Sequence, residues 1–290
     1  MSKFLALSAL AAVVSAGCLP EPSSHGVTFP PIPAHGCPAK ALACTNPTRD
    51  NSTSLDGCCV PNQGLYVYSQ NWTMGYCQNP NNTCAETTLR ALPKNQFTLH
   101  GLWADYCDGS YETSPLGCDP ARRDDNAKAT VDKLAPKSLR QEMEKVWLAA
   151  DGDYNWFWSH EWNKHGTCVS TLNPKCFTKP SPSQDLLAFF RASLNLRPRF
   201  NLYKIFAAHG VVPSTTHAYN FTDFQAALKA ETGFEGAFQC TNNANGTAFL
   251  SEVWTYLIAR PGLKFDGHAP VKPFSSCKIS KPIYYLPQKH

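Results

Sequence analysis

The chain has 290 residues, of which 43% are hydrophobic and 17% are charged, and a formal net charge of +4 at neutral pH. Its length and hydrophobic content allow one sizeable core, which excludes an intrinsically disordered protein. The mild positive charge is compatible with a phosphate-bearing ligand but does not by itself indicate a nucleic-acid-binding protein.

Residues 1–17 have the features of a secretory signal peptide. Lys3 supplies the positive end, Phe4 to Val14 form an apolar run, and Val14-Ser15-Ala16 provides small residues for cleavage. A membrane anchor is the alternative, but the run is too short to span a bilayer, and no later stretch is apolar enough. We therefore expect no membrane partner and a secreted, extracellular protein, with a vacuolar or lysosome-like compartment as the other destination.

Thirteen cysteines in an exported chain indicate disulfides. Cys18 lies at the end of the leader and is the odd one, so the others could form six bridges. A zinc site is disfavoured, because the spacings Cys37-x6-Cys44 and Cys58-Cys59 suit tetrahedral coordination poorly. Five sequons are expected glycosylation sites: Asn51, Asn71, Asn81, Asn220 and Asn245.

The first half of the chain contains two predicted strands. Residues 18–36 are rich in proline and predict an irregular lead-in to a single domain over 37–290. Four cysteines in the turn-rich segment 37–59 indicate a disulfide-held region with one or two short helical turns. Aromatic and β-branched residues predict strands over 64–72 and 96–103.

Helices dominate the prediction for the middle of the chain. The segment 104–126 is polar and is predicted to be a long loop, whereas 127–149 has a helical pattern with a break near Pro136. A short helix is expected from Phe157 to His165, ended by Gly166.

The last third mixes helices and strands. Helices are predicted over 183–195, with Ser183 as N-cap, and from Thr222 to Thr232, ended by Gly233. Strands are predicted over 237–240, 250–259 and 279–286. Because no regular βαβ repeat is present, the predicted class is α+β, with a central, mostly antiparallel sheet, helices packed around it and many disulfides.

The stretch from Phe157 to Cys168 is unusually dense in ionisable side chains. On a helix with about 100° per residue, four of them fall within about 140° of one another: His160, Glu161, Lys164 and His165. They can be surface residues of a solvated turn, ligands of a zinc ion, or groups that hold an anionic transition state. Zinc is disfavoured because the protease pattern is His-Glu-x-x-His, and here the i+4 position is a lysine.

Phosphoryl transfer needs groups of the third kind, which hold an anionic transition state, with a base and an acid on opposite sides of the phosphorus. One helix cannot easily supply both. His100, at the end of the predicted strand 96–103, is the obvious second supplier. The alternative is a structural histidine packed between Leu99 and Trp103.

Two segments resemble the active-site signatures of the ribonuclease T2 family, especially of its fungal members. They are Phe97-Thr98-Leu99-His100-Gly101-Leu102-Trp103 and Phe157-Trp158-Ser159-His160-Glu161-Trp162-Asn163-Lys164-His165-Gly166-Thr167-Cys168. The resemblance extends from about Cys37 to about Leu286. It implies a secreted endoribonuclease that cleaves single-stranded RNA with little base specificity.

The resemblance also implies a role for each ionisable residue. His165 is the general base, His100 the general acid, His160 a phosphate ligand, and Glu161 and Lys164 stabilise the transition state. RNA is first converted to 2′,3′-cyclic phosphates, which are hydrolysed more slowly to 3′-phosphates. No metal or other cofactor is required, and two histidines in opposite protonation states predict a bell-shaped pH profile.

Base-binding positions follow from the same resemblance. Trp103, Asp105 and Tyr111 match positions that hold the base 5′ to the cleaved bond, and Phe157 matches an aromatic of the second base site. Trp103 and Phe157 can equally be core residues, and Asp105 a turn residue. Ala104 departs from the proline common in fungal relatives.

The family pattern implies a set of disulfides that the residues alone leave open. It gives Cys37–Cys59, Cys44–Cys107, Cys58–Cys176, Cys118–Cys168 and Cys240–Cys277, and leaves Cys77–Cys84 as a local pair. An RNase-like protein that acts by binding, as a toxin, recognition factor or storage protein, is the main alternative. Since no catalytic histidine is missing, we expect an active, monomeric enzyme with single-stranded RNA as its partner.

Overall fold

The computed structural model describes residues 37–38, 40–45 and 57–288. The predicted leader at 1–17, the lead-in at 18–36 and the sequon at Asn51 lie outside the described residues. None of the described helices has the length and apolarity needed to cross a membrane.

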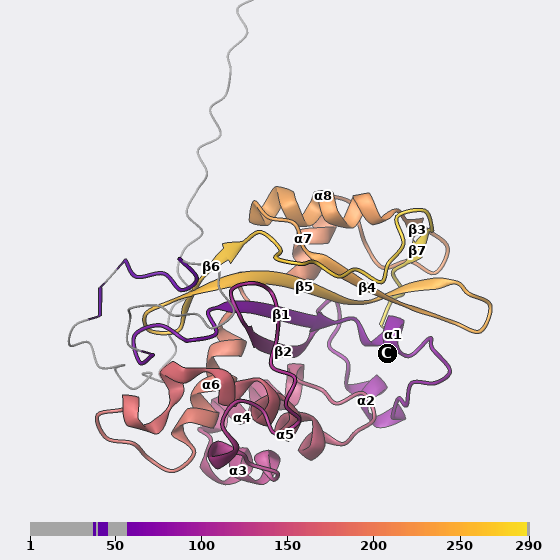
Figure 1. Cartoon of the computed structure of the whole chain (residues 1–290). Helices are drawn as coiled ribbons and strands as arrows, with labels where there is room; N and C mark the ends of the chain where they lie inside the picture. The colour runs from indigo at the N-terminus through magenta and orange to yellow at the C-terminus, as the bar shows by residue number, and fades with distance from the viewer. Residues whose placement is uncertain (1–36, 39, 46–56, 289–290) are drawn as a thin grey trace, which may run out of the picture.

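In the described part of the chain, seven strands form one sheet (Figure 1). They are β1 (Leu65–Asn71), β2 (Thr98–Asp105), β3 (Ala218–Tyr219), β4 (Ala237–Asn242), β5 (Ala248–Arg260), β6 (Lys264–His268) and β7 (Ile283–Tyr284). β5 pairs antiparallel with β1, β4 and β6 and parallel with β7, while β2 pairs with β1 at the edge. The sheet is thus mostly antiparallel, and the α+β prediction is confirmed.

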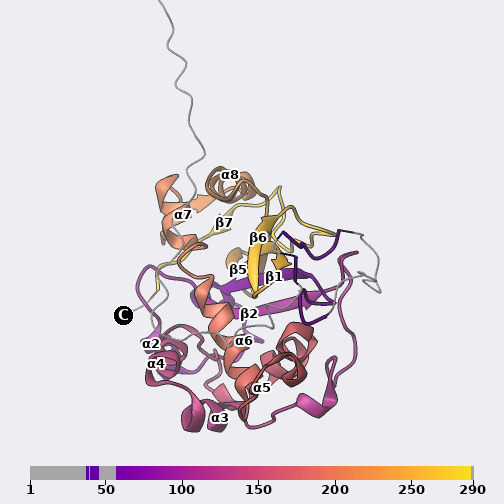
Figure 2. The ribbon, with the colours of Figure 1, turned by 90° about the vertical axis from the view of Figure 1, so that its left-hand side faces the viewer.

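Helices cover both faces of the sheet. The α-helices are α1 (Thr73–Tyr76), α2 (Glu86–Ala91), α3 (Ala127–Leu134), α4 (Lys137–Val146), α5 (Tyr154–Lys164), α6 (Gln184–Asn195), α7 (Leu202–Ala208) and α8 (Phe221–Thr232). Four short 3-10 turns, η1 (Pro120–Arg122), η2 (Gly166–Cys168), η3 (Ser170–Leu172) and η4 (Pro174–Cys176), occur in the described chain. Figures 1 and 2 show α3 to α6 beneath the sheet, and α7 and α8 above it.

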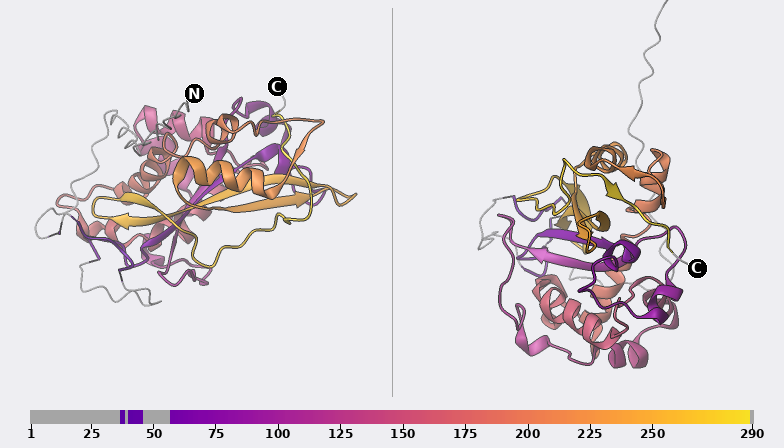
Figure 3. Two further views of the ribbon diagram at one scale, coloured as in Figure 1. Left: turned by 90° about the horizontal axis from the view of Figure 1, so that it is seen from above. Right: turned by 90° about the vertical axis from the view of Figure 1, so that its right-hand side faces the viewer.

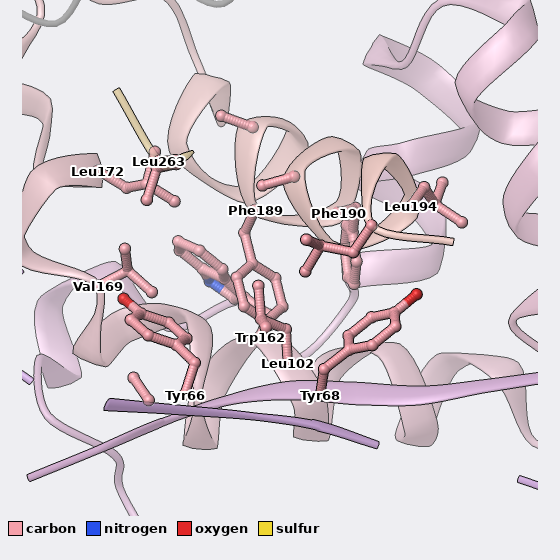
Figure 4. Close-up of a cluster of buried hydrophobic side chains, with 14 of the residues drawn as sticks. Tyr66, Tyr68, Leu102, Trp162, Val169, Leu172, Phe189, Phe190, Leu194 and Leu263 are labelled. Atoms are coloured by element: carbon pink, nitrogen blue, oxygen red, sulfur yellow. The ribbon is translucent and has the colours of Figure 1, made fainter. Parts of the chain in front are cut away.

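The main core fills the space between the sheet and the lower helices (Figure 4). Alternate residues of β1, Tyr66 and Tyr68, point away from the strand toward Trp162 of α5 and Phe189 and Phe190 of α6. Each of these five residues is at most 1% exposed. Since burial of one such side chain contributes about 1.5–3 kcal/mol, this packing fixes α5 firmly against the sheet.

The helices α7 and α8 cover the opposite face of the sheet (Figure 3), and a second core lies beneath them. Phe206 of α7, Phe224 of α8 and Phe238 of β4 pack together with ring centroids 5.4–6.4 Å apart. The two cores hold the long strand β5 from both sides.

The predicted helices around Pro136 and Gly233 are confirmed. Pro136 separates α3 from α4, and Gly233 ends α8 with a φ of 81°. Two other helix ends lie where they were predicted, but their capping differs from the prediction. Ser183 has a φ of 54° and makes no side-chain capping bond. Gly166 continues into η2 without a positive φ, and an added Cβ would overlap the Trp162 ring, so close packing explains this glycine.

Several short elements differ from the prediction. The described residues of 37–59 contain turns but no helix, and the last strand covers only Ile283–Tyr284 of the expected range 279–286. The elements α1, α2, α7, β3 and β6 were not predicted. All are short, and the polar residues of α2 and β6 leave little hydrophobic periodicity.

Six disulfides join the described cysteines. Five are the pairs that the family resemblance implies: Cys37–Cys59, Cys44–Cys107, Cys58–Cys176, Cys118–Cys168 and Cys240–Cys277. The sixth is the local pair Cys77–Cys84, which was also predicted. Cys168 lies in η2, directly after α5, so its bridge ties the end of that helix to the loop at Cys118.

The described sequons differ in exposure. Asn81, Asn220 and Asn245 are exposed, whereas Asn71 is partly buried at the end of β1. Glycosylation at these positions stays a prediction.

Candidate active site

A bulge in β2 places His100 at the edge of the sheet. Ser69 of β1 faces Gly101, but the next residue, Gln70, faces Leu99, so His100 is the extra residue between them. Bulges of this kind redirect a side chain out of the regular alternation. His100 Nε2 then lies 3.7 Å from Glu161 Oε1 of α5.

The Glu161 side chain is completely buried between α5 and β2. Trp103 Nε1 donates to its Oε2 at 3.0 Å, while Oε1 has no hydrogen-bond partner among the described residues. Burial raises the pKa of Glu161 to about 7, although His100 and Trp103 oppose the rise. Gly101 makes this approach possible, because a Cβ there would overlap Glu161 Oε2.

Glu252 of β5 is a site residue that the sequence interpretation missed. Its Oε1 lies 2.7 Å from His100 Nδ1 and also accepts the Ser69 hydroxyl. Burial by itself lowers the pKa of His100, but Glu252 and then Glu161 outweigh it and raise that pKa to about 9. The available signal was a single carboxylate within the otherwise uncharged strand prediction at 250–259.

His165 follows α5 directly and stacks on Trp103, with ring centroids 5.4 Å apart. The His160 ring lies 5.9 Å from it. Burial, followed by the neighbouring His160, His100 and Lys164, holds the pKa of His165 well below its ordinary value. His165 is therefore a neutral imidazole at neutral pH, in contrast to His100.

Lys164 does not point its ammonium at Glu161. Lys164 Nζ donates to the carbonyls of Glu112 and Ser114, at 2.6 and 2.8 Å. An ammonium has three N–H donors, so one is left for a phosphate oxygen. The structure thus connects Lys164 to the predicted loop 104–126, a contact that the helix pattern did not indicate.

The predicted base-binding residues have different environments. Phe157 is buried, with its ring 5.6 Å from that of His100, and Trp103 is partly buried between Glu161 and His165. Tyr111 is 62% exposed. Burial raises the pKa of Asp105 to about 8, so it is a neutral acid at neutral pH that can donate as well as accept.

Three potential metal ligands come together among the described residues. Ligand atoms of His160, Glu161 and His165 lie within 4.8 Å of one another. Their neighbour His100 is cationic below pH 9, and Glu161 already accepts from Trp103. The positive charge of His100 repels a divalent cation, and the hydrogen bond from Trp103 competes for Glu161. The absence of a metal requirement stays a prediction.

The chain matches known proteins over most of its length. Residues 63–271 match the Ribonuclease T2 family. Ribonuclease Rh of Rhizopus niveus is 37% identical over 227 residues, which cover 78% of this chain and 83% of that protein. Ribonuclease T2 of Aspergillus oryzae is 31% identical over 244 residues, which cover 82% of this chain and 80% of that protein.

The fold has a solved counterpart. The crystal structure of Actibind, a T2 ribonuclease, superposes with a TM-score of 0.70 at 25% identity, covering 88% of this chain and 98% of Actibind. With the family match, these relatives show that the chain belongs to the ribonuclease T2 family, is of the fungal type, and is an RNA endonuclease.

Proposed function

We propose that the protein cleaves single-stranded RNA with little base specificity. The first step is transphosphorylation to a 2′,3′-cyclic phosphate, and the second is slower hydrolysis to a 3′-phosphate. One observation carries the proposal: His165 and His100 both lie beside the buried carboxyl group of Glu161, in surroundings that lower the pKa of His165 and raise that of His100.

In the first step His165 is the general base. Its neutral imidazole accepts the proton of the ribose 2′-hydroxyl, whose oxygen attacks the phosphorus. His100 is the general acid. Because Glu252 binds Nδ1, the Nε2–H of His100 is directed toward the site and can protonate the departing 5′-oxygen. In the second step water takes the place of the departed 5′-hydroxyl. His100 now accepts the proton of the water as its oxygen attacks the phosphorus, and His165 protonates the 2′-oxygen as its bond to phosphorus breaks.

The remaining residues bind the phosphoryl group as its charge grows. We assign phosphate binding to His160 and transition-state stabilisation to Glu161 and Lys164. With a pKa of about 7, Glu161 is mostly protonated in acid, so its Oε1 can donate to a phosphoryl oxygen without repelling it. Lys164 keeps one N–H for the same purpose. Because Glu161 is protonated below its pKa, turnover is favoured on the acidic side of neutrality.

Export is part of the proposal. The leader predicted over 1–17 and the six disulfides of the described chain fit an oxidising compartment outside the cytosol. We therefore propose a secreted ribonuclease, with a vacuolar or lysosome-like location as the alternative.

A dinucleoside monophosphate such as adenylyl-3′,5′-uridine tests the reaction. Chromatography of a time course, with and without EDTA, is expected to show adenosine 2′,3′-cyclic phosphate first and the 3′-phosphate later, at equal rates in both buffers. Loss of cleavage in EDTA would indicate a metal-dependent hydrolase. A folded protein that binds RNA without cleaving it would support the alternative of an RNase-like binding protein.

A further inference from the structure

Trp156, in the first turn of α5, is a large aromatic side chain facing solvent. It is 59% exposed, whereas Trp158 and Trp162 of the same helix are buried. Its backbone N–H donates to the Asp153 side chain, which fixes the start of the helix. Its ring lies parallel to that of His160, with centroids 5.0 Å apart and an interplanar angle of 13°. Trp156 lies outside the two segments that resemble the family signatures, and it has no role in the proposed mechanism.

A hollow of about 720 Å³ lies beside the Trp156 ring. It lies between α5 and the end of the loop that precedes α3. Its lining includes Pro115, Arg123, Asn155, Asn163 and Lys164, as well as Trp156 and His160. Since His160 and Lys164 also belong to the proposed catalytic centre, the hollow adjoins that centre.

The charges around the hollow are balanced. Arg123 pairs with Asp125 at 2.8 Å, and Lys164 is bonded to backbone carbonyls. Asp125 and Asp153 add two carboxylates to the lining. An extra phosphate would thus meet as many anionic as cationic side chains. A nucleobase suits the hollow better, because stacking on an indole face needs no net charge.

We propose that Trp156 and this hollow form a subsite for the base of a third nucleotide, beyond the two nucleotides that flank the cleaved bond. This inference rests on the proposed function, since it takes the substrate to be an RNA strand. The base stacks on the outer face of Trp156, while the inner face stays against His160. The side-chain amides of Asn155 and Asn163, which also line the hollow, already bond within the protein. Stacking on Trp156 is therefore the main contact with the base.

Kinetics on substrates of different length test the subsite. We compare kcat/KM for a dinucleoside monophosphate with kcat/KM for trinucleotides extended by one nucleotide at the 5′ or the 3′ end. For Trp156→Ala, the ratio of kcat/KM for one of the extended substrates to kcat/KM for the dinucleotide is expected to fall about tenfold. Trp156→Phe retains most of it, because an aromatic face remains.

Tyr111→Ala is the matched control, because Tyr111 is also an exposed aromatic side chain but belongs to the predicted dinucleotide site. It is expected to lower kcat/KM on all three substrates by a similar factor. If Trp156→Ala does the same, Trp156 acts only through His160 and the subsite is refuted. The subsite is also refuted if Trp156→Ala leaves kcat/KM relative to the dinucleotide unchanged for both extended substrates.

A binding measurement separates the subsite from catalysis. Analogues with 2′-deoxyribose at the cleaved position cannot react, so their Kd values report binding alone. Trp156→Ala is expected to weaken binding of the extended analogue about tenfold and to change binding of the deoxydinucleotide little. The tenfold effect should be the same at about 0.05 and 0.2 M salt. A difference that disappears at the higher salt would mean a phosphate contact and overturn the base subsite. Wild-type protein that binds these analogues selectively but cleaves no RNA would overturn only the catalytic proposal.

Discussion

His100 and Glu252 are 152 positions apart, yet the Nδ1 atom of His100 lies 2.7 Å from Glu252 Oε1. The contact crosses from the bulge of the edge strand β2 to the central strand β5. The Ser69 hydroxyl, on the strand between them, donates to the same carboxylate oxygen. The carboxylate therefore orients the imidazole and keeps it cationic, both of which a general acid needs.

Replacement of Glu252 by glutamine should lower the pKa of His100. The wild-type value of about 9 arises because Glu252 and Glu161 outweigh the effect of burial. Without the Glu252 charge, we expect the value to fall by at least one unit. NMR titration of the His100 ring measures it directly. As a control, Glu235→Gln removes a carboxylate paired with Lys229 on the surface and should leave the titration unchanged. A His100 pKa that stays near 9 in Glu252→Gln would contradict this assignment.

The same pair should make stability depend on pH. The pKa of His100 is raised, so its contribution is fully present below about pH 6.5 and is lost as pH rises through about 9. Burial raises the pKa of Glu252, but His100 and Ser69 outweigh burial and lower it. The stabilisation by the Glu252 carboxylate is therefore present above the ordinary pKa of a glutamate and is lost as pH falls through the lowered pKa. Glu252→Gln should therefore cost about 2–3 kcal/mol near pH 6 and less at pH 9.5. Urea unfolding at both pH values measures the difference, and an equal loss at both would show that charge pairing is not its cause.

Glu161→Gln should change the alkaline side of the pH–rate profile. Wild-type Glu161 loses its proton near pH 7, and the resulting carboxylate can neither donate to the phosphoryl group nor avoid repelling it. Glutamine donates at every pH, so activity should persist toward the pKa of His100, at a kcat lowered about tenfold or more. Without the Glu161 charge that pKa lies below its wild-type value of about 9 but is still raised by Glu252. The kcat/KM profile between pH 4 and 10 measures the shift. An alkaline limb that stays near pH 7 would exclude Glu161 as its source.

Asp105→Asn should lower the preference for adenine more than overall turnover. Asp105 is uncharged at the pH of turnover, since burial raises its pKa to about 8, and its carboxyl can both donate to and accept from a purine edge. The amide keeps the shape but changes the donor pattern. Competition between dinucleotides that differ in the 5′ base measures the preference. Equal losses on every base would refute a role in recognition.

The sequence predicted the parts of the site that lie within short segments. His160, Glu161 and His165 come from one helix and its first following residue, and His100 from one strand, so spacing and motif suffice to find them. The Ser69–Glu252–His100 contact was missed because it depends on the order of three strands, which no local pattern encodes. Lys164 was predicted on the correct helix, but the partners of its ammonium lie in a loop without periodicity.

The most direct test of the central claim separates the acid from the base. Uridine 3′-(4-nitrophenyl phosphate) has a leaving group that departs without protonation, so it bypasses the general acid but still needs the general base. Both His100→Phe and His165→Phe should lose about 10³-fold in kcat/KM on a dinucleotide. On the nitrophenyl ester, His100→Phe should recover to within about tenfold of wild type, whereas His165→Phe should stay inactive. Recovery by His165→Phe instead, or by neither variant, would contradict the assigned roles.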